Sequence, residues 1–211
     1  GVAQRMYKLD SLDQVTPEMR RSAKAINFGI LYGMGVQALA KGLGVKQAEA
    51  QEFYLAYYST FAGLSEYLKN CKIEAERDGF TSTLFFRRRY FQDIRSNIPY
   101  IKAAAERMAI NAPIQGTDAD MAKIAMVMID EWIEKKGLRD KIHIIAQVHD
   151  ELLCEIDDAD EGFVERTTSE LKKIMEQVLE ASIIPKTMEQ LPKVPIVVGA
   201  KKGKNWGKIE S

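Results

Sequence analysis

The sequence predicts an α+β fold: helices fill the first half of the chain, and helices cover one face of a small antiparallel sheet in the second half. Three observations support this prediction. A capped helix is expected over residues 17–32, a β-hairpin is expected over residues 142–157, and helical periodicity dominates the segments between them. We therefore expect two parts, residues 1–101 and residues 102–211.

The helix expected over residues 17–32 has clear signals at both ends. Thr16 can cap its start, Pro17 suits the first helical position, and Gly33 ends the pattern. Within the helix, cationic and aromatic residues recur every four positions, and each step of four turns a helix by only about 40°. These residues are Arg20, Lys24, Phe28 and Tyr32.

This face of the helix suits a nucleoside triphosphate. Guanidinium and ammonium groups donate hydrogen bonds to phosphates, and aromatic rings offer flat apolar surfaces to a sugar and a base. An ordinary amphipathic helix with a solvated basic edge would show a similar pattern. The helix by itself therefore leaves both interpretations open.

The hairpin expected over residues 142–157 has an acidic turn, which we place at Asp150 and Glu151. Tight hairpins usually have Asn-Gly or Asp-Gly at the turn because its central residues need positive φ, so two carboxylates there are unusual. Mg²⁺ prefers hard oxygen ligands and would explain this choice, whereas a solvated acidic turn is the alternative. The first strand alternates apolar residues at Ile142, Ile144, Ala146 and Val148.

The rest of the chain predicts more helices and two more strand regions. Asp78-Gly79 marks a turn before a strand pair, Thr117 can cap the helix that follows, and a last strand would return Trp206 to the sheet. That helix carries apolar residues at three and four spacing, so it should pack under the hairpin. In chain order these elements are helices at 45–61 and 64–77, a strand pair within 80–90, a helix at about 118–135, a helix at 161–180 and a strand at 194–198.

Composition indicates a globular chain without indicating its function. Thirty basic and thirty acidic residues cancel, so no net charge attracts nucleic acid and any such binding must be local. Cys71 and Cys154 are too few for a disulfide framework, and we expect both to be reduced. No segment is long and apolar enough for a membrane span or a signal peptide, so the expected compartment is the cytoplasm.

Four motifs, in this order, resemble family A DNA polymerases, the DNA polymerase I group. They are Arg-x-x-x-Lys-x-x-x-Phe-Gly-x-x-Tyr-Gly from Arg20, the stretch Ala104 to Thr117, His149-Asp150-Glu151, and the closing Gly203-Lys204-Asn205-Trp206. The resemblance covers almost the whole chain. It implies that a deoxynucleoside triphosphate donates its monophosphate to a primer 3′ hydroxyl on a DNA template, which is the reaction of a DNA-directed DNA polymerase.

The resemblance also implies two subdomains and their partners. Residues 1–101 would be the fingers subdomain, and residues 102–211 would be the carboxyl-terminal part of the palm. The partners would be primer–template DNA and deoxynucleoside triphosphates, with no membrane, and the compartment would be the nucleoid region of the cytoplasm.

The fingers motif implies a role for each of its four residues. Arg20 and Lys24 would bind the β and γ phosphates and neutralise charge on the leaving pyrophosphate. Phe28 would pack against the incoming sugar and disfavour dideoxynucleotides. Tyr32 would stack at the templating position until the fingers close.

The palm motifs imply the metal and DNA contacts. Asp150 would be a ligand of the catalytic metals, Glu151 would support it, and His149 would lie near the primer terminus. Three residues on one helix would reach the minor groove, where every base pair offers acceptors and pair shape can be checked without reading sequence. They are Arg107, Asn111 and Gln115.

One half of the expected metal site is missing from the sequence. The family holds two Mg²⁺ ions with a second aspartate in an upstream Asp-Tyr-Ser motif, and no such motif occurs here. We therefore expect this chain to be the carboxyl-terminal piece of a larger polymerase, completed by an amino-terminal part in the same or a separate chain. Alone it should be almost inactive, because two ions about 4 Å apart need several carboxylates.

Three places depart from the family pattern, and at one of them Phe91-Gln92 replaces the more usual leucine-proline. Phe86 stands where the family usually has glycine, just before three arginines that would touch the template. Asp118 stands where a small residue is usual, and there it could help to start a helix.

Three alternatives remain open. A phage-type single-subunit RNA polymerase shares the helix cations, the Tyr-Gly pair and a His-Asp turn, although Phe28-Gly29 and Glu151 favour the DNA enzyme. A non-catalytic DNA-binding remnant would have lost the upstream aspartate. Half of a naturally split polymerase would find that aspartate in a separate chain.

Overall fold

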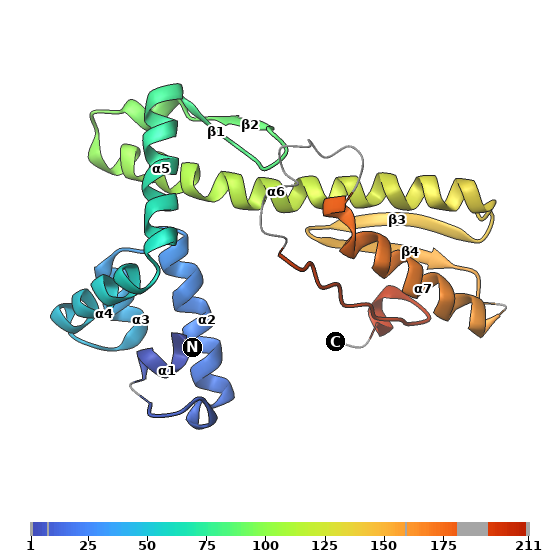
Figure 1. Cartoon of the computed structure of the whole chain (residues 1–211), viewed down its shortest axis with the longest axis horizontal. Coiled ribbons are helices and arrows are strands. Elements are labelled where there is room, and N and C mark those ends of the chain that lie inside the picture. The colour runs from blue at the N-terminus through green and yellow to red at the C-terminus, as the bar shows by residue number, and fades with distance from the viewer. Residues whose placement is uncertain (1, 8, 159, 181–193, 210–211) are drawn as a thin grey trace. The chain divides into compact units, whose positions relative to one another are not determined.

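The structure is a computed structural model that describes residues 2–7, 9–158, 160–180 and 194–209 (Figure 1). The chain divides into two compact units, one of residues 1–82 and 87–114 and the other of residues 83–86 and 115–211. In each unit the described residues form one two-stranded antiparallel sheet among helices or beside them. The predicted α+β fold is confirmed.

The first unit is mostly helical. Its strand pair follows the turn at Gly79, as the sequence predicts, and pairs Phe80 with Tyr90. The expected elements did not include a separate helix at 36–43. In chain order the unit contains α1 (Val2–Met6), α2 (Pro17–Leu31), α3 (Val36–Leu43), α4 (Gln47–Thr60), α5 (Ala62–Asp78), β1 (Phe80–Ser82), β2 (Arg88–Tyr90) and the first part of α6 (Pro99–Lys136), with short 3₁₀ segments at Leu12–Gln14 and Gln92–Arg95.

The helix α2 begins where the sequence predicts and ends one residue earlier than predicted, at Leu31. The Thr16 hydroxyl accepts a hydrogen bond from the Met19 N–H at 3.3 Å, and Pro17 occupies the first turn, where its missing N–H is not needed. Tyr32 follows the last helical residue, and Gly33 then takes a φ of 84°. A positive φ suits glycine, so the chain leaves the helix there.

One core joins α2 to the two helices that follow it. Its members are apolar, apart from the Tyr57 hydroxyl, and come from one face of each helix, so burial of these faces holds the three helices together. They are Ile26, Ile30, Leu39, Ala40, Ala50 and Tyr57. A second cluster, in which Ala75, Phe91, Ile94, Ala105, Ala109 and Ala112 are buried, packs α5 against the first part of α6.

The helix α6 runs without a break through Pro113, so the expected helix start at Thr117 is wrong. Proline lacks an N–H and leaves the carbonyl of the residue four positions earlier, Ala109, without its helical donor. The Thr81 hydroxyl donates to that carbonyl instead, at 3.3 Å. Thr117 accepts from the Leu84 N–H at 2.9 Å and caps no helix, and Asp118 is an exposed residue in the helix interior.

The second unit is built around the predicted hairpin. Strands β3 (Ile142–Val148) and β4 (Glu151–Ile156) are antiparallel, with a bulge between Ile144 and Ala146. The later part of α6 and the helix α7 (Glu161–Glu176) pack on it, as Figure 1 shows. The buried residues of this core are Ile129, Ile133, Ile142 and Leu171. The prediction of a helix under the hairpin is confirmed.

The hairpin turn lies one residue earlier than expected. The two turn residues are His149 and Asp150, and Glu151 already belongs to β4, where it pairs with Val148. The residue with positive φ is His149, at 58°, so the imidazole residue rather than a carboxylate residue adopts the left-handed conformation. Alternation of apolar residues locates the strands but does not distinguish a turn at 149–150 from one at 150–151.

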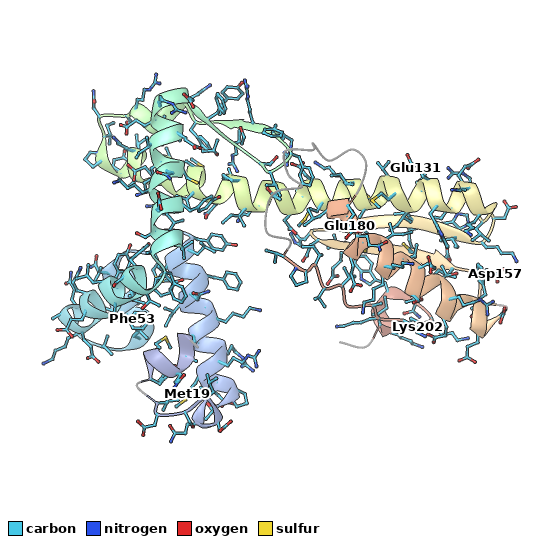
Figure 2. The ribbon with its side chains drawn as sticks, viewed as in Figure 1. Met19, Phe53, Glu131, Asp157, Glu180 and Lys202 are labelled. Atoms are coloured by element: carbon cyan, nitrogen blue, oxygen red, sulfur yellow. The ribbon has the colours of Figure 1, made fainter. Side chains whose placement is uncertain are left out.

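The expected strand at 194–198 is absent from the structure, in which these residues have no regular secondary structure. Side chains of α7 and of the turn before it hold the closing segment in place of a sheet edge. Glu176 accepts from the Val198 N–H at 3.1 Å, Lys202 (Figure 2) pairs with Glu165, and Lys204 pairs with Asp158 at 3.5 Å. The segment ends in a 3₁₀ turn, Trp206–Lys208, whose tryptophan is 63% exposed.

The α7 helix also ends earlier than predicted, at Glu176, and a 3₁₀ turn at Val178–Glu180 follows.

Phe86 has a φ of 63°, a conformation that favours glycine. Its N–H donates to the Thr83 carbonyl at 2.9 Å, which closes a tight turn, and its side chain is 61% exposed. The residue at which the sequence departs from the family pattern therefore keeps a glycine-like backbone.

The two cysteines are free thiols, as expected. Burial raises the pKa of both Cys71 and Cys154, so both are protonated at neutral pH. Among the described residues, no helix combines the length and the hydropathy that a membrane span requires.

Candidate nucleotide-binding helix and acidic hairpin

The exposed face of α2 carries an ordered row of cations and rings. Lys24 Nζ lies 5.7 Å from the centroid of the Phe28 ring, and the rings of Phe28 and Tyr32 are stacked, with centroids 6.0 Å apart and planes 14° from parallel. Arg20 stands one turn before Lys24 and is exposed, and Phe28 is 41% exposed. The structure thus brings the four predicted residues together as one ridge, which we call the α2 ridge.

The opposite face of α2 is fixed in the core. Ile26 and Ile30 are buried among α3 and α4, and the Tyr57 hydroxyl of α4 donates to Asn27 Oδ1 at 2.5 Å. Burial raises the pKa of Tyr57, so its hydroxyl remains a donor at neutral pH. Sequence reasoning missed this bond, because nothing in the pattern of either helix pairs residue 57 with residue 27.

Gly33 lets the side chain of Arg107 lie against the end of α2. A Cβ atom at Gly33 would stand 2.7 Å from Arg107 Cγ, which is closer than real Cβ contacts come. The aliphatic part of Arg107 therefore packs on the glycine backbone, at the end of the helix where the dipole favours a cation. The glycine after Tyr32 was the only sequence signal for this approach.

The hairpin tip presents its polar residues to solvent. His149, Asp150 and Glu151 are all exposed, and Gln147 Nε2 donates to the His149 carbonyl at 3.0 Å, which braces the turn. Within the part of the chain that the structure describes, the carboxylates of Asp150 and Glu151 have no hydrogen bond or ion pair, so both can accept an external ligand.

The donor chemistry of the tip fits Mg²⁺ only in part. Carboxylate oxygens are the ligands that Mg²⁺ prefers, and Asp150 and Glu151 supply them. However, no group of three or more His, Cys, Asp or Glu side chains among the described residues lies close enough together to hold a metal ion. The tip can therefore contribute ligands to a metal site but does not complete one.

The three predicted minor-groove residues lie four apart along α6. Arg107 and Gln115 are exposed, and Asn111 is half-buried. Asn111 Oδ1 is buried and accepts no hydrogen bond from the described residues. Arg107 and Asn111 belong to the first unit, whereas Gln115 and His149 belong to the second.

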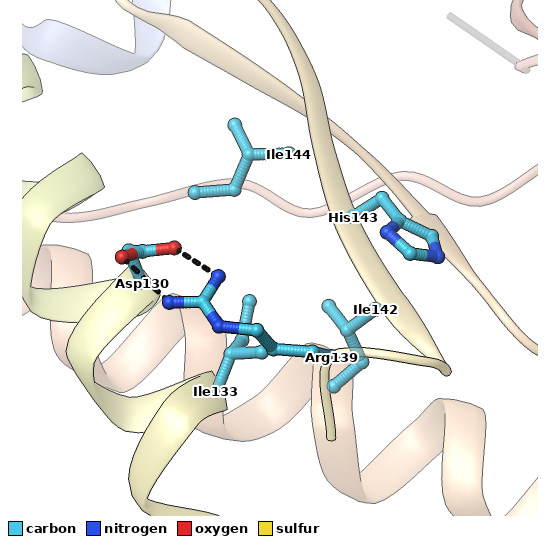
Figure 3. A pocket seen from close by; sticks show the side chains of 6 residues that line it. All are labelled: Asp130, Ile133, Arg139, Ile142, His143 and Ile144. Carbon is cyan, nitrogen blue, oxygen red and sulfur yellow. Dashed lines mark hydrogen bonds and ion pairs between the residues drawn. The ribbon is translucent and has the colours of Figure 1, made fainter. Parts of the chain in front are cut away.

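A small pocket lies at the end of the hairpin opposite the tip (Figure 3). Arg139 donates to Asp130 at 2.8 Å and pairs with Glu134, so two carboxylates already neutralise its charge. The lining residues are Asp130, Ile133, Arg139, Ile142, His143 and Ile144. No predicted site residue is among them.

The chain belongs to DNA polymerase family A, whose model matches residues 1–208. It is 41% identical over 195 residues to DNA polymerase I of Pseudomonas aeruginosa, a match that covers 92% of this chain and 20% of that protein. It is 39% identical to DNA polymerase I of Caldicellulosiruptor bescii, over 97% of this chain and 22% of that protein. The chain thus spans about a fifth of the length of these relatives.

A solved structure supports the same assignment. The fold resembles the POL domain of Pol1 from M. smegmatis, solved in complex with DNA primer–template and dNTP, with a TM-score of 0.74 and 39% identity. The match covers 84% of this chain and 30% of that one. The predicted resemblance to family A DNA polymerases is confirmed.

Proposed function

We propose that this chain is the nucleotide-binding and carboxyl-terminal palm portion of a DNA-directed DNA polymerase. The observation that carries the proposal is the α2 ridge, in which Lys24 lies over the Phe28 ring and Phe28 stacks on Tyr32. Family membership and the relatives named DNA polymerase I support it. They also favour a DNA polymerase over a phage-type RNA polymerase.

The order of groups along the α2 ridge matches the order of groups in a nucleotide. Arg20 and Lys24 would take the β and γ phosphates, whose charge grows as pyrophosphate leaves. Phe28 would contact the sugar and disfavour dideoxynucleotides, and Tyr32 would stack at the templating position. The opposite face of the helix is held in the core, so the ridge is presented on a rigid element.

Asp150 would be the ligand for the catalytic Mg²⁺ ions, with Glu151 beside it. When bound, the two ions stabilise charge on the attacking and leaving oxygens of the transfer. The described residues supply too few ligands for both ions, so the remaining carboxylates would come from an amino-terminal part of the polymerase. The isolated chain should therefore be almost inactive.

Primer–template DNA would lie against α6 and the hairpin tip. Arg107, Asn111 and Gln115 would reach the minor groove of the new base pairs, and His149 would lie near the primer terminus. Contacts to phosphates would make this binding weaken steeply as salt rises. In this assignment residues 1–101 are the fingers and residues 102–211 are palm.

Primer extension tests the proposal. The chain is assayed with Mg²⁺ and four deoxynucleotides, first alone and then mixed with a polymerase amino-terminal half that carries the Asp-Tyr-Ser aspartate. We expect extension only in the mixture, and a loss of about 10³-fold or more for Asp150→Asn, because metal ligation is worth several kcal/mol in the transition state. Asp140→Asn is the matched control, since Asp140 is an exposed aspartate beside the start of β3 rather than at the tip.

Each result has a distinct meaning. Full activity of Asp150→Asn would refute the metal assignment. Absence of extension by a mixture shown to assemble, together with salt-sensitive binding to primer–template, would identify a DNA-binding remnant instead.

A further inference from the structure

A buried tyrosine links α4 to the middle of the α2 ridge. The Tyr57 hydroxyl donates to Asn27 Oδ1 at 2.5 Å, and Tyr57 is only 6% exposed. Asn27 directly precedes Phe28 and follows Lys24 by three residues. The bond therefore reaches α2 between the residue assigned to the phosphates and the residue assigned to the sugar.

Apolar packing restrains the rotation of α2 about its own axis less sharply than a hydrogen bond does. Ile26 and Ile30 press the helix against α3 and α4, but burial of apolar area is non-directional. A hydrogen bond is directional and weakens steeply when its angle changes. The bond from Tyr57 thus adds a directional restraint to that of the apolar contacts.

A small rotation of α2 would move Lys24 away from the phosphates and Phe28 away from the sugar of the same nucleotide. Side-chain tips lie about 6 Å from the axis of a helix, so a rotation of roughly 20° moves them by about 2 Å. Misplacement by about 1 Å is enough to cost roughly a hundredfold in a well-oriented reaction. A ligand that touches both Lys24 and Phe28 senses such a rotation more than one that touches Lys24 alone.

Packing against neighbouring aromatic rings holds Tyr57 in place, so its hydroxyl can fix the position of Asn27. Its ring lies 4.9 Å from the Phe61 ring and 5.8 Å from the Tyr58 ring, centroid to centroid. Phe53, which Figure 2 shows on α4, lies 6.5 Å away on the same measure. Three aromatic rings of α4 and the ring of Phe61, which follows the last residue of α4, leave the hydroxyl little freedom to move.

We propose that Tyr57 is a positioning residue of the nucleotide site: through Asn27 its hydroxyl sets the rotation of α2, and so places Lys24 and Phe28 for one and the same nucleotide. This inference rests on the nucleotide role proposed for the α2 ridge. It predicts that loss of the hydroxyl lowers the preference for a nucleoside triphosphate over inorganic triphosphate, which presents phosphates without a sugar.

Calorimetric titration of the 211-residue chain tests the inference with two ligands, a deoxynucleoside triphosphate and inorganic triphosphate. For Tyr57→Phe we expect the Kd of the nucleotide to rise about tenfold, the change that corresponds to one lost hydrogen bond. The Kd of inorganic triphosphate should change less than about twofold, because the cations remain. Tyr54→Phe is the matched control: it removes a hydroxyl from the same helix, but one that bonds within α4, to Tyr58 at 3.4 Å.

A double variant identifies the route through Asn27. If the hydroxyl acts through that amide, Tyr57→Phe in an Asn27→Ala background should change nucleotide affinity no further. Thermal unfolding of each variant shows whether the fold has been retained. A merely structural role would weaken both ligands alike.

The outcomes separate this inference from the proposed function. Equal weakening of both ligands by Tyr57→Phe, no weakening at all, or the same loss of preference in Tyr54→Phe would overturn the positioning role alone. A wild-type chain that binds neither ligand would overturn the nucleotide role of the α2 ridge, and the positioning role with it.

Discussion

The Thr81 hydroxyl of β1 donates a hydrogen bond to the Ala109 carbonyl of α6 at 3.3 Å. Ala109 lies four residues before Pro113, so this is the carbonyl that the proline leaves without a helical donor. Thr81 is 3% exposed, and water does not readily replace its hydroxyl. The bond explains how a helix of 38 residues passes through a proline.

Thr81→Val should lower the free energy of unfolding of the chain by about 1–2 kcal/mol, because the shape is kept while a buried carbonyl loses its donor. Chemical denaturation measures this change. In a Pro113→Ala background the same substitution should cost less, because the alanine N–H can then donate to the Ala109 carbonyl. Equal costs in the two backgrounds would contradict the explanation.

Gly33→Ala should destabilise the chain by more than Gly44→Ala. Both glycines have positive φ, at 84° and 68°, so both substitutions carry a backbone cost of about 1 kcal/mol. Only at Gly33 would the new Cβ also meet Arg107, at 2.7 Å, whereas the space beside Gly44 is open. Denaturation midpoints of the two variants isolate the steric part, and equal losses would show that Arg107 moves aside freely.

Phe86→Gly should stabilise the chain by about 0.5–1 kcal/mol. The phenylalanine holds a left-handed φ of 63° and is 61% exposed, so relief of strain should exceed both the few lost contacts and the added chain entropy. Thermal unfolding measures the effect. Phe85→Gly is the control, because Phe85 has no positive φ and should be destabilised by the same substitution; a destabilised Phe86→Gly would show that its exposed ring contributes more than the strain removes.

The chain should lose stability as pH rises through about 10, the pKa of an ordinary tyrosine. Burial raises the pKa of Tyr57, Tyr58 and Tyr67, so these phenols ionise more easily in the unfolded chain than in the folded one. Their contribution to the free energy of unfolding is complete below pH 10 and is lost progressively as the pH rises above 10. Urea midpoints from pH 8 to pH 11 should show this decline.

Substitution of a single tyrosine distinguishes ionisation of these phenols from a general effect of high pH on the chain. Tyr58→Phe should flatten part of the decline, because it removes one of the phenols whose pKa is raised by burial. A midpoint that stays level to pH 11 in the wild-type chain would contradict the prediction.

Local patterns in the sequence determined the elements that carry the candidate site. Thr16, Pro17 and Gly33 located both ends of α2, and four-residue spacing put Arg20 and Tyr32 on one face, because capping and helical periodicity act within a few residues. Apolar alternation located β3 and β4 in the same way. Both features are local, and both are confirmed.

Tertiary structure alone decided what depends on residues that are distant in the chain. The helix continues through Pro113, and the Thr81 hydroxyl, from another element, donates to the Ala109 carbonyl that the proline leaves without a donor. Likewise, Asn27 accepts a hydrogen bond from Tyr57, thirty residues away. The segment at 194–198 reads as a strand by its apolar pattern, yet it is bonded to Glu176 and not to a sheet. Hydrogen-bond partners of this kind are chosen by packing in space, and no local pattern encodes them.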